Sequence, residues 1–186
     1  MFRYLTKDIE RLIQKRVTFF RALKLLLLDV SVQCVALLRI QTFFTRHNLY
    51  FLAKITRNLN QYLTGAEFGI GVQIGAGLII RHPNGIVVGH GAVIGDNCTL
   101  LHQVTLGEKY GDQQPSTGKT KYPIVGNHVT IGAGAKILGA VHIGDYAKIG
   151  ANAVVIQDVN SHSVAVGVPA KVIPNKKKEY ELQVLS

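Results

Sequence analysis

The chain has 186 residues, 47% hydrophobic and 17% charged, which is enough for one domain with a real core and excludes a wholly disordered chain. Its formal net charge is +10, yet no aromatic-interleaved basic motif accompanies the charge, so we expect no nucleic-acid partner. The charge favours a solvated basic helical face and, after that, attraction to anionic lipid or to an acidic substrate. The two cysteines, Cys34 and Cys98, lie in different kinds of segment and make no disulfide or zinc framework, which suits a reducing compartment.

Residues 1–63 form the first region, which we expect to be α-helical. It contains no Gly or Pro, and Leu, Ile, Phe and Val recur at steps of three and four residues. Breaks near Asp29 and near residues 45–48 predict two or three helices. Eleven of the 21 Lys and Arg residues precede residue 60, so these helices are basic.

The longest apolar run, residues 22–38, is interrupted by Lys24, Asp29 and Gln33. A membrane-spanning helix needs about 20 predominantly apolar residues, so we favour a packed helix. No small-residue cleavage site follows the run, so we expect no signal peptide and a cytoplasmic protein. A peripheral contact of the basic helices with the inner face of the membrane stays open.

From residue 64 to residue 173 the sequence keeps a six-residue period. The apolar residues that lead the hexads are Phe68, Ile74, Ile80, Val88, Ile94, Leu100, Leu106, Val125, Ile131, Ile137, Ile143, Ile149 and Val155. Four places after a lead residue the side chain is small or branched, as at Ala92, Cys98, Val104, Ala135 and Val159. One large and one small inward side chain per hexad would fill a narrow coil, so the period predicts a mainly β fold, a parallel β-helix.

The period fails at two places. Ile80 and Val88 are eight residues apart, and His82 lies within the two-residue surplus. Leu106 and Val125 are 19 apart, which predicts an extruded polar loop over residues 107–123. Exceptions to a regular scaffold are where function is most often found, although a bulge can relieve strain and a loop can be ornament. Residues 174–186 read as a polar tail.

Glu67 and His82 form a candidate catalytic pair. If one coil spans three hexads, as the family resemblance given below implies, the chain one coil after Glu67 reaches the bulge from His82 to Gly85. We therefore expect Glu67 beneath His82 at one corner, where its carboxylate would orient the imidazole as a general base. His102 stands at the same hexad position three hexads later, and two stacked histidines would also suit a metal.

Four stretches, RHPNGIVVGHGAVIG, LLHQVTLGE, IGAGAKILGAVHIGDYAKIGANAVV and AVGVPAKVI, resemble serine acetyltransferases and related saccharide O-acetyltransferases. The resemblance implies a left-handed β-helix and an acetyl-CoA-dependent O-acetyltransferase that transfers directly to a hydroxyl. It makes His82 the general base and Glu67 its carboxylate partner, where serine acetyltransferases usually carry Asp.

The resemblance also implies a homotrimer, or a dimer of trimers, with acetyl-CoA along a groove between neighbouring prisms. No metal is expected. Five residues would contact acetyl-CoA on this basis: Gly107, Ala133, Gly134, Ala151 and Lys171. Most of these residues are small, and the corners of the coil need small residues in any case. Lys171 would either bind the phosphates of CoA or be a solvated lysine with no role in binding.

Three positions that would contact the acceptor depart from serine acetyltransferases. Arg81 replaces an Asp that can hold an ammonium group, and Lys121 and Tyr122 replace an Arg-His pair. Since Arg81 would repel an ammonium group, we expect a saccharide of a cell-surface polysaccharide pathway, with serine O-acetylation for cysteine synthesis as the alternative.

Two readings outside this class are more distant. A metal-dependent hydratase on the same prism would need two zinc histidines five residues apart, and no pair of histidines here has that spacing. A non-catalytic trimeric scaffold would release no thiol from acetyl-CoA with any acceptor.

Overall fold

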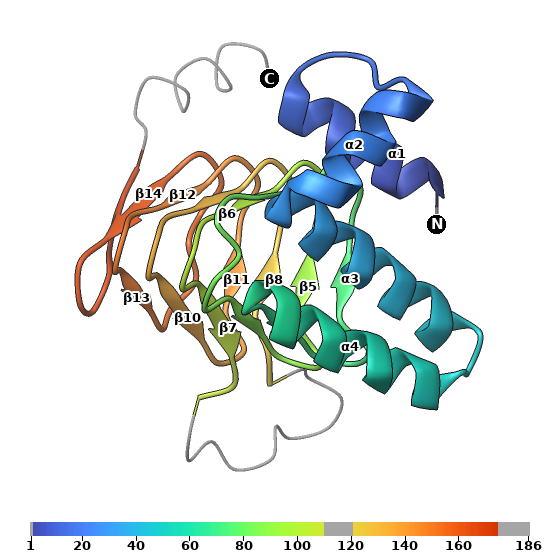
Figure 1. The fold of residues 1–186 in the computed structure, drawn as a ribbon. Helices are drawn as coiled ribbons and strands as arrows, with labels where there is room; N and C mark the ends of the chain where they lie inside the picture. Colours follow the sequence, from blue (N-terminus) through green and yellow to red (C-terminus); the bar gives the residue numbers. More distant parts are fainter. Residues whose placement is uncertain (1, 110–120, 175–186) are drawn as a thin grey trace.

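The computed structural model describes residues 2–109 and 121–174, with four helices at one end of a prism of short strands (Figure 1). The helices are α1 (Phe2–Ile13), α2 (Phe19–Leu28), α3 (Val30–Arg46) and α4 (Tyr50–Thr64). The expected breaks are confirmed at Asp29, which caps α3, and at Asn48. The expectation of two or three helices is wrong, because the chain also breaks directly after α1, at Gln14. This residue takes a left-handed φ of 54°, although no Gly or Pro marks the position in the sequence.

Fifteen short strands of the described chain build three sheets that form the faces of the prism. Sheet A contains β1 (Glu67–Phe68), β4 (Val87–Val88), β7 (Thr105–Gly107), β10 (Lys136–Leu138) and β13 (Val154–Val155). Sheet B contains β2 (Gln73–Ile74), β5 (Val93–Ile94), β8 (Ile124–Val125) and β11 (His142–Ile143). Sheet C contains β3 (Ile79–Ile80), β6 (Thr99–Leu100), β9 (Thr130–Ile131), β12 (Lys148–Ile149), β14 (Val164–Val166) and β15 (Lys171–Ile173).

The chain visits the sheets in the order A, B, C, and the turns between them define three corners, A–B, B–C and C–A. All strand pairs are parallel except β14 with β15, which closes the far end. Residues 110–120 of the predicted extruded loop and residues 175–186 of the predicted tail lie outside the described residues.

The predicted core is confirmed. Every lead residue from Phe68 to Val155 is buried, and so are the small or branched residues four places later. Together they fill the prism as one cluster, which the side chains of Cys34, Val35 and Leu38 on α3 extend.

The registers of two coils differ from the expected three hexads. Glu67 pairs with Val87, two places beyond the expected partner, because the first coil keeps the two-residue surplus. Ile143 pairs with Val159, two places short of the expected partner, so Val159 takes a lead position rather than the small-residue position predicted for it. The period thus fails a third time, between Val155 and Val159.

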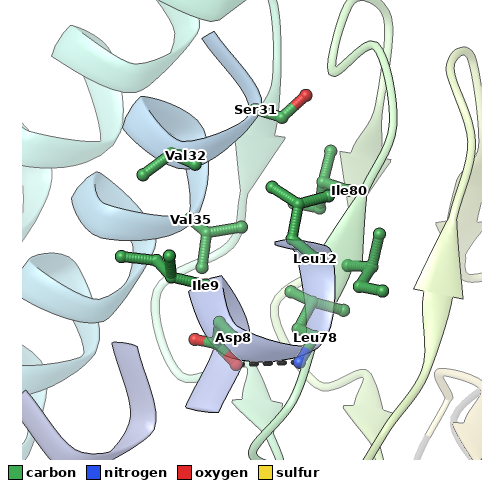
Figure 2. Close-up of a pocket in the computed structure, with 9 residues that line it drawn as sticks. Asp8, Ile9, Leu12, Ser31, Val32, Val35, Leu78 and Ile80 are labelled. Atoms are coloured by element: carbon green, nitrogen blue, oxygen red, sulfur yellow. Dashed lines mark hydrogen bonds between the residues drawn. The ribbon is translucent and has the colours of Figure 1, made fainter. Parts of the chain in front are cut away.

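The helices cap the open edge of the first coil, which would otherwise expose unpaired backbone groups. Arg39 of α3 donates to the carbonyls of Ile74 (2.9 Å) and Gly75 (2.6 Å) and is paired with the buried carboxylate of Asp8 (2.8 Å). Asp8 in turn accepts from the amide of Leu78 at 2.8 Å, the bond drawn in Figure 2. The cavity beside this bond is about 10 Å³, room for one water molecule at most.

No helix within the described ranges combines the length and the apolar character that crossing a membrane would take.

Candidate active site

Corner C–A brings together four side chains from successive coils. His82, His102, Ala133 and Ala151 each lie two residues after the lead residue of their hexad, in the turns that leave β3, β6, β9 and β12. These four strands are neighbours in sheet C, in register. The column therefore begins with two imidazoles and continues with two methyl groups, and we call it the C–A column.

His82 stands at the exposed end of this column. Its φ of 57° is left-handed. Two backbone hydrogen bonds hold the bulge around it: the amide of Arg81 donates to the carbonyl of Leu100, and the amide of Gly85 donates to the carbonyl of Gly65, both at 2.9 Å. Anchored on both sides, the bulge holds His82 with its imidazole exposed.

The rings of His82 and His102 meet edge to face, with centroids 6.2 Å apart. Nδ1 of His102 is buried, and no hydrogen-bond partner for it exists among the described residues. A buried ring nitrogen without a partner is costly unless a ligand or water satisfies it, so His102 points to a polar occupant of this corner.

Glu67 lies on β1, one strand along from the bulge, and is half buried. Because its coil is two places longer than three hexads, it stands opposite Val87, and the backbone carbonyl that accepts from the bulge is that of Gly65. Its carboxylate lies 3.7 Å from Nη2 of Arg57, and within the described chain it makes no hydrogen bond to His82. The pairing of Glu67 with His82 therefore stays a prediction. Arg57 comes from α4, where no hexad pattern could have indicated it.

Ala133 and Ala151 contribute backbone rather than side-chain chemistry. Within the described chain, no acceptor lies in hydrogen-bonding range of either amide N–H. Their neighbours are paired: Gly134 donates to His102 and Asn152 donates to Ala133, at 2.9 and 2.8 Å. The amides of Ala133 and Ala151 are thus left available to a ligand that carries carbonyl oxygens.

Gly134 and Lys171 lie beside this column. The side chain of Asn152 folds over Gly134, whose φ is 71°, so a side chain there would be both strained and obstructed. Lys171 on β15 pairs with Val166, and Val166 contacts Gly150 next to Ala151. Lys171 is exposed and lies at the β15 end of the column.

Gly107, Lys121 and Tyr122 belong to a different corner. Gly107 ends β7 on the A–B side of sheet A, and its carbonyl accepts from Gly139. The ring of Tyr122 packs over Gly89 and Gly91, between β4 and β5, and Lys121 precedes it. One copy of the chain therefore does not bring these three residues to His82.

The two thiols with raised pKa values lie away from this corner, and the described residues form no metal site. Burial raises the pKa of the Cys34 thiol to about 12 and that of Cys98 to about 11, and neither belongs to the C–A column. In the part of the chain that the structure describes, no three His, Cys, Asp or Glu side chains are grouped so as to hold a metal ion.

The prism and its corner match known transferases. Residues 122–157 match the family described as bacterial transferase hexapeptide, six repeats. A serine acetyltransferase of Helicobacter pylori is 40% identical over 91% of this chain and 96% of its own length. Two solved serine acetyltransferases, from Brucella abortus with coenzyme A and from soybean with serine, cover 92% of this chain at TM-scores of 0.81 and 0.80, with 28% and 31% identity. The chain spans about two thirds of those solved chains.

These matches define a left-handed parallel β-helix of the hexapeptide-repeat transferases, as the resemblance implied. More narrowly, the chain belongs to the serine acetyltransferase family and is an acetyl-CoA-dependent O-acetyltransferase. The relatives do not support the expected link to polysaccharide synthesis, since those above are all named serine acetyltransferases.

Proposed function

We propose that this chain acetylates the hydroxyl of a small polar acceptor at corner C–A, with His82 as the general base. The observation that carries the proposal is the C–A column, where an exposed imidazole is followed by two backbone amides that have no partner among the described residues. The amides of Ala133 and Ala151 suit the amide carbonyls of the pantetheine arm of acetyl-CoA, and Lys171 suits its phosphates. Gly134 would keep the groove open beside them.

The reaction follows from these positions. A neutral His82 nitrogen takes the proton of the acceptor hydroxyl as the oxygen attacks the thioester carbonyl carbon. The tetrahedral intermediate then collapses, its carbon–sulfur bond breaks, and the CoA sulfur takes the proton back from the imidazolium. Glu67, by turning from Arg57 towards His82, would stabilise that imidazolium.

We propose L-serine as the first candidate acceptor. Its support is the family: the Helicobacter pylori relative matches almost end to end, and the soybean enzyme was solved with serine. This reverses the order expected from the sequence, which put a saccharide first. An O-acetylserine product would feed cysteine synthesis.

A saccharide hydroxyl is the second candidate, and Arg81 favours it. Arg81 is exposed and directly precedes His82, so its guanidinium would face an acceptor that approaches the base. Positive charge there opposes the ammonium group of serine and suits a carboxylate, a phosphate or a neutral sugar.

The deciding experiment measures thiol release from acetyl-CoA with L-serine and with a panel of sugars and oligosaccharides. Serine-dependent release by the wild type supports serine, and release with a sugar alone supports the second candidate. Arg81→Asp should raise kcat/KM for serine in either case, because it replaces a repulsive charge by an attractive one. No release with any acceptor would contradict the proposed function.

A homotrimer would complete the site, because the residues expected to bind the acceptor and CoA lie at two corners. Corner C–A of one copy, with His82, would face corner A–B of its neighbour, with Gly107, Lys121 and Tyr122. Mixed oligomers of His82→Ala and Tyr122→Ala test this, since shared sites would regain part of the activity that each variant lacks. We place the enzyme in the cytoplasm, where acetyl-CoA is made and two free thiols stay reduced.

A further inference from the structure

Helix α2 presents its apolar side chains outward. None of its ten residues is buried, and Phe19, Phe20 and Leu27 are 76%, 81% and 67% exposed. At about 100° per residue, Phe19, Phe20, Leu23 and Leu27 share one arc of about 100°. A stripe that in most globular proteins faces the core is here turned away from it.

Cations flank this stripe. Arg21 and Lys24 are exposed on α2 beside it, and Lys15 and Arg16 are exposed in the turn before it. From residue 15 to residue 28 the chain has these four cations and no carboxylate.

The two nearest acidic side chains are already engaged. Glu10 accepts from the amide of Val17 at 3.2 Å, and Asp29 caps α3 by accepting from Ser31 and Val32. Bonds to neutral amides leave both carboxylates charged, but the five cations from Arg11 to Lys24 outnumber them, so the charge around α2 is net positive, which favours an anionic partner.

An apolar groove widens the same surface. It lies between α1 and α2, has a volume of about 320 Å³, and is lined by side chains such as Phe2, Leu5, Phe19 and Leu23. Because Phe19 and Leu23 belong to both, the stripe and the groove form one apolar area.

The exposed apolar side chains of α4 make a useful contrast. Phe51, Ile55 and Tyr62 are 74%, 49% and 85% exposed, and α4, like α2, carries two cations, Lys54 and Arg57. Arg57 lies 3.7 Å from Glu67, so one of these charges is offset. Of these two helices, α2 alone combines an apolar face with a cluster of unopposed cations.

We propose that α2 lies in the plane of an anionic lipid bilayer, with Phe19, Phe20, Leu23 and Leu27 in the acyl boundary and the cations at the headgroups. Burial of apolar area and attraction to anionic lipid act together in such helices, and neither alone gives firm binding. The proposal does not depend on which acceptor the enzyme uses.

The test is co-sedimentation of the full chain with vesicles of phosphatidylcholine alone and with phosphatidylglycerol added. We expect binding to the anionic vesicles only, weakened by salt. Each surface cation contributes about a fivefold factor, so Arg21→Gln with Lys24→Gln should weaken binding about 25-fold. Phe20→Ser with Leu27→Ser should abolish it. The matched control, Lys54→Gln with Lys148→Gln, removes two exposed cations elsewhere and should have no such effect.

Failure to bind anionic vesicles would overturn the proposal, and so would binding that both α2 variants leave unchanged. A smaller oligomer for Phe20→Ser with Leu27→Ser in sedimentation velocity, with no vesicle binding by the wild type, would instead assign the stripe to a contact between copies. If that variant does not fold, the Arg21 and Lys24 variant still decides the question, because its substitutions are exposed and polar.

Discussion

Corners B–C and C–A have the same backbone but differ in what fills them. Three residues after the lead residue, both turn through left-handed φ, 56° at His128 and 60° at Tyr146 on corner B–C, 58° at Gln103 and 56° at Asn152 on corner C–A. On corner B–C the rings of His128, Tyr146 and His162 stack at 4.6 and 4.8 Å, nearly parallel. On corner C–A two imidazoles are followed by methyl groups.

The backbone amides make the same distinction. On corner B–C the amides two places after the lead residue, at Ala76, Asp96 and Asn127, are each bonded to an Asp or Asn side chain one coil further on, at 2.6 to 2.8 Å. On corner C–A the corresponding amides of Ala133 and Ala151 have no partner within the described chain. The amides of corner B–C are bonded to its own side chains, whereas those of corner C–A are left available, which is the difference expected between a structural corner and a binding corner.

The largest expected effect tests whether only corner C–A is catalytic. His82→Ala should lower kcat by about 10³-fold, because general-base catalysis contributes on that order. The matched control is His128→Ala, which removes an exposed histidine with almost the same φ, 56° against 57°, from corner B–C. Thiol release measures both variants. Near-normal turnover in His82→Ala, or an equal loss in His128→Ala, would contradict the assignment.

A smaller loss is expected at Glu67. Glu67→Gln keeps the size of the side chain and removes its charge, and should lower kcat by about 10²-fold, since the carboxylate orients the base rather than reacting. Thiol release under the conditions used for His82→Ala measures the loss. A kcat that Glu67→Gln leaves unchanged would contradict the pairing of Glu67 with His82.

Cofactor binding should distinguish the corners next. Ala151→Leu places a branched side chain over the unpaired amide, and should raise KM for acetyl-CoA about tenfold, a loss of about 1.4 kcal/mol, with less change in kcat. Tyr146→Leu on corner B–C should leave KM unchanged. The fold should survive both changes, since Ala151 and Tyr146 are exposed. An unaltered KM in Ala151→Leu would place the cofactor elsewhere.

At corner B–C, where the amides bond to side chains of the same corner, we expect a substitution to change stability rather than kinetics. Asp145 accepts from the amide of Asn127 at 2.6 Å, so Asp145→Ala leaves that donor without its partner. We expect the free energy of unfolding to fall by about 1 kcal/mol, measured by urea denaturation, with kcat and KM unchanged. A kinetic defect without a stability loss would show that corner B–C also serves the reaction.

Much of this fold could be predicted from the sequence because the six-residue period fixes which side chains point inward. It does not fix the length of each coil. The surplus at His82 was visible as an interval, but only the strand register shows that it lengthens the coil of Glu67 beyond three hexads. The deficit before Val159 was hidden, because Val159 is apolar and buried in either role.

The site was predicted less completely, since its chemistry depends on the stacking of coils. His82 stood out as an exception to the period. The difference between the amides of Ala133 and Asn127 could not be predicted from the period. Both residues follow a lead residue by two places, and only the side chains one coil further on, which accept from Asn127 but not from Ala133, differ. Arg57 and the break at Gln14 lie in the helices, where the sequence carries no period of six and no glycine.

The smallest effect is expected at Cys98, which lies on the inner side of corner B–C. It is fully buried, its thiol donates to the carbonyl of Gly126 at 3.1 Å, and burial raises its pKa to about 11 from an ordinary 9.0. Little thiolate exists at pH 8, so native protein should resist alkylation at both Cys98 and Cys34 until it unfolds. Because the unfolded thiol ionises first, stability should also fall as pH rises from 9 towards 11. Mass spectrometry after iodoacetamide treatment reads the labelling, and rapid native modification of Cys98 would show that corner B–C opens.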